Sequence, residues 1–92
     1  MIQNSFIKLG LGLNFSMLNV IIYSPEKVLF EGKARSIVFP GEQGVFEVLP
    51  YHKPLVSRLL GGKILIDDRS IAIRCGLVGI RSNKATAIVE EP

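Results

Sequence analysis

Short runs of β-favouring residues, separated by turn residues, fill almost the whole chain after residue 17. No apolar stripe with the 3.6-residue period of a helix is long enough to interrupt them. The runs cover residues 18–24, 28–33, 35–39, 44–49, 55–60, 63–67, 70–75, 77–81 and 84–90. Many short strands at this spacing are typical of a sandwich or barrel. We therefore predict an all-β fold, a small flattened barrel or β-sandwich of about nine to ten short strands.

Turn residues indicate where these strands reverse. Residues 67–69 (Asp-Asp-Arg) and 82–83 (Ser-Asn) separate neighbouring runs, and Asn tolerates the positive φ that a tight hairpin can require. We expect both segments to be hairpin tips, with Asp67 and Asp68 serving turn formation and solubility. Residues 61–62 (Gly-Gly) and Gly76 mark sharp bends or close approach of two backbones.

Apolar alternation identifies the expected core. Ile71, Ile73 and Cys75 fall on one face of a predicted strand, so we expect Cys75 to be a small buried apolar side chain. Four aromatic residues lie among aliphatic neighbours and are also expected in the core, namely Tyr23, Phe30, Phe39 and Phe46.

The first sixteen residues differ in composition from the rest, with glycines among leucines and a single charge at Lys8. They lack the basic start and the small-residue cleavage site of a signal peptide. We expect residues 1–16 to be an extension, upstream of a native start at Met17, and residues 17–92 to be the domain. A short ordered arm is the alternative for residues 1–16.

Candidate catalytic groups are few. Cys75 is the only cysteine and His52 the only histidine, so neither an internal disulfide nor a cluster of histidines can form. We expect His52 to serve a loop or an interface, with a structural hydrogen bond as the alternative. Ser57 and Ile64 stand where a phosphate-binding loop needs glycine and Ser or Thr. We predict no catalytic residue, no metal site and no cofactor.

Four segments follow one another in a recognisable order. Residues 18–41 (LNVIIYSPEKVLFEGKARSIVFPG) contain an opening strand, an S-x-E turn, an aromatic-x-G step and a second strand. Residues 41–59 (GEQGVFEVLPYHKPLVSRL) are similar to a G-E-x-G-x-x-P-G-H-A-P-L pattern. Residues 61–66 (GGKILI) and 71–90 (IAIRCGLVGIRSNKATAIVE) complete the series. Together they resemble the N-terminal domain of ATP synthase epsilon subunits.

The chain departs from this family pattern at two positions and at its end. Tyr51 replaces the usual glycine of P-G-H-A-P, and Lys53 replaces the alanine. Most family members continue into a helical hairpin, which binds ATP in some and inhibits hydrolysis in others. No residue follows Pro92 in this sequence. We therefore expect a short form that consists of the β-sandwich alone and lacks the regulation by the hairpin.

The resemblance implies a non-catalytic rotor subunit in the central stalk of an F-type ATP synthase. The implied partners are the gamma subunit and the c-ring, and through them the alpha/beta head, so that proton translocation is coupled to ATP synthesis. Carried over by position, Ser24, His52 and Ser57 match gamma-facing residues. Gln43, Gly44 and Val45 match the turn near the c-ring. The implied location is the cytoplasmic face of the bacterial inner membrane, reached only through the complex and without binding nucleic acid.

Two other functions remain open at this point. A small oligonucleotide-binding barrel has a similar strand pattern, although the net charge of +3 comes from scattered cations rather than a basic run. An enzyme or ligand-binding barrel is the other alternative, and the scarcity of titratable groups weighs against it.

Overall fold

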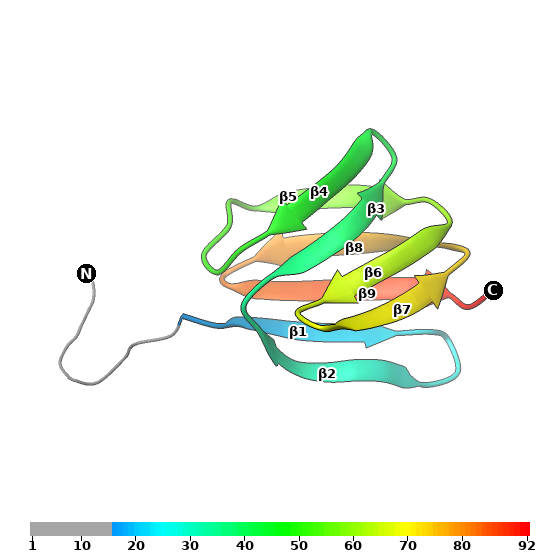
Figure 1. Cartoon of the computed structure of the whole chain (residues 1–92), viewed down its shortest axis with the longest axis horizontal. Helices are drawn as coiled ribbons and strands as arrows, with labels where there is room; N and C mark the ends of the chain where they lie inside the picture. The colour runs from blue at the N-terminus through cyan, green and yellow to red at the C-terminus, as the bar shows by residue number, and fades with distance from the viewer. Residues whose placement is uncertain (1–15) are drawn as a thin grey trace, which may run out of the picture.

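Nine β-strands make up most of residues 16–92, the part of the chain that the computed structural model describes (Figure 1). Their number confirms the sequence prediction, and no helix occurs among these residues. The strands are β1 (Leu18–Tyr23), β2 (Val28–Ala34), β3 (Ile37–Gly41), β4 (Gly44–Val48), β5 (Leu55–Leu59), β6 (Gly62–Ile66), β7 (Arg69–Ile73), β8 (Cys75–Arg81) and β9 (Lys84–Glu90).

The strands form one curled sheet that folds over itself into two layers. Its order is β2-β1-β9-β8-β5-β3-β6-β7, with β4 paired to β3. The first layer is β2-β1-β9-β8-β5, and the second is formed by β4, β3, β6 and β7, which lie in front of it in Figure 1. Neighbouring strands are antiparallel except β1 and β9, which run parallel. This architecture is the predicted β-sandwich.

The layers are joined at a corner where β5 leaves the first layer and meets β3. Gly41 pairs with Leu59, and the Leu60 N–H donates to the Pro40 carbonyl at 2.8 Å. Because β5 continues through a short bend into β6, the chain passes from one layer to the other without a long loop. This corner also fixes the β3–β4 hairpin beside β5.

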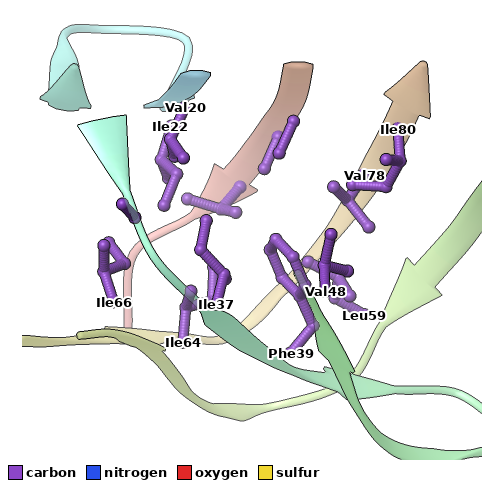
Figure 2. Close-up of a cluster of buried hydrophobic side chains, with 14 of the residues drawn as sticks. Val20, Ile22, Ile37, Phe39, Val48, Leu59, Ile64, Ile66, Val78 and Ile80 are labelled. Carbon is purple, nitrogen blue, oxygen red and sulfur yellow. The ribbon is translucent and has the colours of Figure 1, made fainter. Parts of the chain in front are cut away.

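Apolar side chains from both layers fill the space between them. Alternate residues of β1 and β9 point inward and are buried, as period-2 strands require. Figure 2 shows side chains of the two layers directed toward one another. The buried residues are Leu18, Val20, Ile22, Ala34, Ile37, Phe39, Val48, Leu59, Ile64, Ile66, Ile73, Val78, Ile80, Ala85, Ala87 and Val89. At about 1.5–3 kcal/mol for each large side chain, this burial is the main stabilising contribution.

The two strands at the ends of the sheet order, β2 and β7, are linked by a side-chain contact. The Arg69 guanidinium carbon lies 5.7 Å from the centroid of the Phe30 ring, within the range of a cation–π interaction. Phe30 is half-buried and packs against the core. The contact therefore covers the core where the two layers are not joined by backbone hydrogen bonds.

Two core predictions need correction. Cys75 is exposed, because a bend at Arg74 ends β7 at Ile73 and Cys75 starts a new strand. The alternation that includes Ile71 and Ile73 therefore stops before Cys75. Among the predicted core aromatics, Phe39 is buried and Phe30 and Phe46 pack partly against the core. Tyr23 is half-buried on the outer face of β1, because its neighbours Leu18, Val20 and Ile22 face inward.

The predicted hairpin tips are confirmed by backbone angles. Asp67, Ser82 and Asn83 have φ of 51°, 50° and 58°, in the left-handed region that tight turns use. The predicted extension, residues 1–16, lies almost entirely outside the described residues. Within residues 16–92, no helix is long and apolar enough to cross a membrane.

Candidate interface site

A groove between the β3–β4 hairpin and β5 brings together four of the six residues predicted to form interfaces. Gln43, Gly44 and Val45 of the hairpin and Ser57 of β5 all line it. The groove has a volume of about 540 Å³ and is open to solvent. Residues matched to the c-ring and one residue matched to gamma thus share one continuous surface.

The hairpin tip is shaped by Gly44 and leaves an apolar side chain in solvent. Gly44 has a φ of 125°, which an L side chain rarely adopts, so glycine suits this position. Val45, the next residue, is 75% exposed. Val56 on β5 is 74% exposed and lines the same groove. Two exposed β-branched side chains therefore line the same groove.

Ser57 lies on the wall of the groove but its hydroxyl is partly engaged. The Oγ donates to the carbonyl oxygen of Arg58 at 2.9 Å, and the residue is half-buried. Ser57 is paired with the buried Val78 of β8, so its side chain lies on the same side of the sheet as that core residue.

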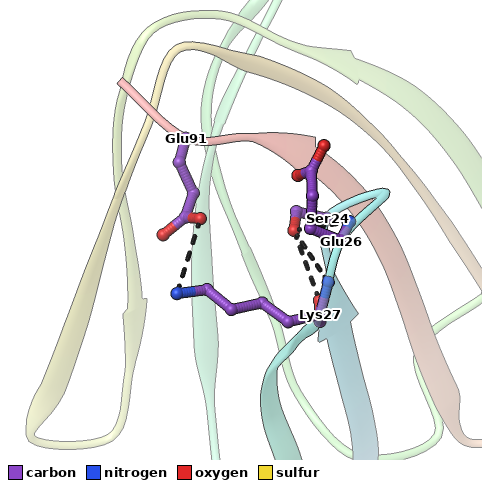
Figure 3. A network of polar contacts seen from close by, with 4 residues as sticks. All are labelled: Ser24, Glu26, Lys27 and Glu91. Atoms are coloured by element: carbon purple, nitrogen blue, oxygen red, sulfur yellow. Dashed lines mark hydrogen bonds and ion pairs between the residues drawn. The ribbon is translucent and has the colours of Figure 1, made fainter.

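Ser24 lies at the end of β1 and builds the turn to β2. It is only 3% exposed, and its Oγ accepts hydrogen bonds from the N–H groups of Glu26 and Lys27, each at 3.2 Å (Figure 3). Its own N–H donates to the Lys27 carbonyl at 2.8 Å. An exposed ion pair between Lys27 and Glu91, at 3.8 Å, connects this turn to the end of the chain. Ser24 therefore stabilises the backbone of the β1–β2 turn and does not present its hydroxyl to solvent.

His52 lies at the opposite end of the first layer, in the loop between β4 and β5. Its N–H donates to the Leu49 carbonyl at 3.2 Å, and its Nδ1 lies 2.7 Å from the Lys53 carbonyl. The imidazole is half-buried. The structure thus separates Ser24 from His52 by the length of β1, and neither residue lines the groove.

Asn83 organises the end of the sandwich that contains His52, and the sequence reasoning assigned it only a turn. Its Oδ1 accepts a hydrogen bond from the Tyr51 N–H at 2.9 Å, and its Nδ2 donates to the Met17 carbonyl at 2.8 Å. Its own carbonyl accepts from the Asn19 N–H at 3.1 Å. One side chain therefore holds the β4–β5 loop and the start of β1 against the β8–β9 turn.

The outer face of the first layer carries apolar side chains that the sequence reasoning missed. Leu77 is 45% exposed and is paired with Ile88, which is 41% exposed. Tyr23 is paired with Ile88 on the next strand, so the three side chains form a stripe across β8, β9 and β1. The available signal was the pair Leu77-Val78, because two successive apolar residues place one of them on each face.

An exposed ion pair joins Arg74 to Glu90 near residue 92. Arg74 donates a short side-chain hydrogen bond to the Glu90 carboxylate. That hydrogen bond and the attraction of the guanidinium lower the pKa of Glu90 from its ordinary value and raise the pKa of Arg74. Within the described part of the chain, no three His, Cys, Asp or Glu residues are grouped so as to hold a metal ion.

Comparison with known proteins identifies the fold family. The model of the ATP synthase delta/epsilon chain, β-sandwich domain, matches residues 17–91. Among curated relatives, the ATP synthase epsilon chain of Nitratiruptor is 44% identical over 78 residues, covering 79% of this chain and 60% of the relative. The epsilon chain of Chlorobaculum tepidum is 37% identical over 75 residues, covering 76% of this chain and 85% of the relative.

Length and structure add to this comparison. The chain spans about 60% of the Nitratiruptor relative and 61% of the epsilon chain of Leptospira borgpetersenii, to which it is 35% identical. A chain of the Euglena gracilis mitochondrial ATP synthase matches with a TM-score of 0.72 at 14% identity, over 91% of this chain and 57% of that one. A chain from the central stalk and c-ring of the Tetrahymena thermophila enzyme matches with 0.66 at 12% identity, over 79% and 63%. These two matches concern the fold. The family match over residues 17–91 shows that the chain belongs to the ATP synthase delta/epsilon family and forms its β-sandwich domain.

Proposed function

We propose that the chain is a non-catalytic central-stalk subunit of an F-type ATP synthase, which links the gamma subunit to the c-ring. In this position it transmits rotation and so couples proton translocation to ATP synthesis. The observation that carries the proposal is the groove where Gln43, Gly44, Val45 and Ser57 meet. A coupling subunit must contact two partners at once, and this groove joins residues that match both contact sets.

The β3–β4 hairpin is the proposed contact with the c-ring. Glu42 and Gln43 form its turn, Gly44 begins β4, and the exposed Val45 side chain supplies apolar area. The ring pairing of Phe39 and Phe46, with centroids 5.5 Å apart, stiffens the hairpin behind the tip. A rigid hairpin suits a coupling contact because it bends little under load and loses little conformational freedom on binding.

The proposed gamma contacts are Ser24, His52 and Ser57, each in a different way. Ser57 contributes from the groove wall and His52 from the opposite loop, with an imidazole nitrogen that can donate or accept. Ser24 is buried, so it supports the contact through the turn that it builds. Contacts at both ends of the first layer would give gamma an extended binding surface.

This role places the chain at the cytoplasmic face of the bacterial inner membrane, as a peripheral part of the complex. The chain itself supplies no chemistry in this account, because catalysis belongs to the alpha/beta head. The family match does not favour the oligonucleotide-binding barrel considered from sequence.

Copurification of the complex tests the proposal. Val45→Asp introduces a charge at the hairpin tip, and His52→Ala removes the imidazole. Leu65→Asp is the matched control for Val45→Asp, because Leu65 is 43% exposed on β6 and does not line the groove. The free energy of unfolding of each variant is expected to lie within about 0.5 kcal/mol of the wild-type value, as is usual for surface substitutions.

The two interface variants should be lost from the complex during purification, whereas Leu65→Asp should be retained. Retention of Val45→Asp on both gamma and c-ring at the wild-type level would show that the groove is not the coupling surface. Failure of the wild-type chain to join the complex would contradict the proposed function itself.

A further inference from the structure

Three cations form a row across the outer face of the first layer, at the end that contains Asn83. Strand register pairs Asn19 with Lys33 on one side and with Lys84 on the other, and Lys84 with Arg81. Lys33, Lys84 and Arg81, the cationic row, are all exposed. Paired residues on neighbouring strands have Cβ atoms about 4.5–5.5 Å apart, so Arg81 and Lys84 are close neighbours of like charge.

No ion pair neutralises the cationic row within residues 16–92. The ion pairs Lys27–Glu91 and Arg74–Glu90 lie at the other end of β1 and β9. Glu31 lies two positions from Lys33 on the same face of β2 and lines the same hollow as Lys33 and Lys84, but it forms no ion pair with either. Like charges directly opposite one another destabilise a sheet. The row is therefore an arrangement that a negatively charged partner would stabilise.

Beside the row, Tyr51 presents its ring to solvent from a strained backbone. Its φ is 63°, in the left-handed region, and its side chain is 72% exposed. This conformation costs a non-glycine residue of order 1 kcal/mol or more, and the hydrogen bond from its N–H to Asn83 helps to hold it. Because Asn83 lies in the turn between Arg81 and Lys84, the backbone of Tyr51 is held beside the turn that joins these two cations.

We propose that Tyr51 and the cationic row form a docking surface for an acidic protein surface that has an apolar pocket at its centre. Tyr and Arg are among the residue types enriched in the anchors of protein interfaces. Because the hydrogen bond to Asn83 holds the backbone at Tyr51, the loop loses little backbone freedom on binding. Carboxylates around the pocket would replace the repulsion between Arg81 and Lys84 by attraction.

The partner is a protein rather than a nucleic acid. A strand of nucleic acid needs aromatic side chains repeated along one strand face with cations between them, and here one exposed ring stands beside three cations. The inference rests on the proposed function, since His52 in the same loop is a proposed gamma contact. Gamma, held in its complex with the catalytic subunits, is therefore the protein to test.

The experiment is titration of the chain against the alpha–beta–gamma complex of the same organism, purified without this chain. The variants are Tyr51→Asn, Arg81→Glu and Lys84→Glu, with Lys63→Glu as the charge-matched control on β6 of the other layer. Asn tolerates left-handed φ, so Tyr51→Asn should melt at or above the wild-type temperature. The same variant should bind the complex about tenfold or more weakly.

Arg81→Glu and Lys84→Glu should each weaken binding by about tenfold, and wild-type binding should weaken from about 50 to about 300 mM salt. Lys63→Glu should bind like wild type. If the wild-type chain binds while Tyr51→Asn and both charge reversals bind equally well, the docking surface is wrong and the proposed function stands. Absence of wild-type binding overturns both. The wild-type chain could also bind oligo(U) RNA or phosphatidylglycerol vesicles more tightly than the complex. If that binding is lost in the same variants, the proposed protein docking surface is wrong.

Discussion

The backbone N–H of Tyr51 donates to Oδ1 of Asn83 at 2.9 Å, although the two residues are 32 positions apart in the chain. The same Asn83 side chain donates to the Met17 carbonyl. The β4–β5 loop, which carries His52 between Pro50 and Pro54, is thus also positioned by the β8–β9 turn. The geometry of one end of the sandwich therefore depends on a single amide.

Replacing Asn83 should destabilise the domain in two separable steps. Asn83→Ala removes two hydrogen bonds and places alanine at a φ of 58°, so we expect a loss of about 2–4 kcal/mol in the free energy of unfolding. Asn83→Gly loses the same hydrogen bonds but tolerates the backbone angle, so its loss should be smaller by about 1 kcal/mol. Urea denaturation measures both. Equal losses for the two variants would show that the backbone angle contributes nothing.

Asp67 should be far more important for stability than its neighbour Asp68. Its Oδ1 accepts hydrogen bonds from the N–H groups of Arg35 and Ser36, each at 3.1 Å, and so ties the β6–β7 turn to the β2–β3 connection. Asp67→Ala should cost about 1–3 kcal/mol because it leaves these donors without their acceptor. Asp68→Ala, on the exposed half of the same turn, should stay within about 0.5 kcal/mol of wild type. Thermal unfolding of the two variants tests this difference. Similar melting temperatures would contradict the stabilising role assigned to Asp67.

Two glycines of β8 should respond oppositely to alanine. A Cβ at Gly76 would lie 2.8 Å from both the Ile88 carbonyl oxygen and Val89 Cγ1, whereas a Cβ at Gly79 would meet nothing within 4 Å. Gly76→Ala must therefore displace β9 and should cost more than about 2 kcal/mol. Gly79→Ala should be neutral or stabilising by up to about 1 kcal/mol, because it reduces the freedom of the unfolded chain. A stable Gly76→Ala variant would contradict the close approach of β8 and β9.

The ion pair between Arg74 and Glu90 predicts a direction of pH dependence. Because Arg74 lowers the pKa of Glu90 in the folded state, the pair stabilises the fold above the carboxyl's ordinary pKa. That contribution is lost as the pH falls through the lowered value. In an NMR titration, Arg74→Gln should raise the Glu90 pKa toward its ordinary value, whereas Lys27→Gln should not change it. An unchanged Glu90 pKa in Arg74→Gln would contradict the assigned cause.

Much of the fold follows from local residue patterns. Alternation and turn residues located all nine strands, because a period of 2 and a left-handed Asn or Asp are local properties of the chain. Cys75 was misplaced for a related reason. A bend at Arg74 interrupts an otherwise regular alternation, and nothing within residues 71–75 marks it.

The candidate site was less predictable, because its parts meet only through long-range pairing. The shared groove of Gln43 and Ser57 depends on the corner where β3 meets β5, and sequence spacing does not show this corner. The row formed by Lys33, Lys84 and Arg81 depends on the register of β2, β1, β9 and β8. The sequence contains these cations as scattered residues, and only the sheet places them side by side.

Rotation of the chain with gamma tests the central claim most directly. Cys75 is the only cysteine of the sequence and is exposed, so a fluorophore can be attached to it without further mutation. A second fluorophore on the fixed part of the complex would then report distance by energy transfer during ATP hydrolysis, in preparations whose labelled complex retains ATP-driven proton pumping. We predict a cyclic change in transfer efficiency whose frequency follows the rate of hydrolysis. Constant transfer during hydrolysis, with gamma shown to rotate in the same preparation, would contradict the assignment of this chain to the rotor.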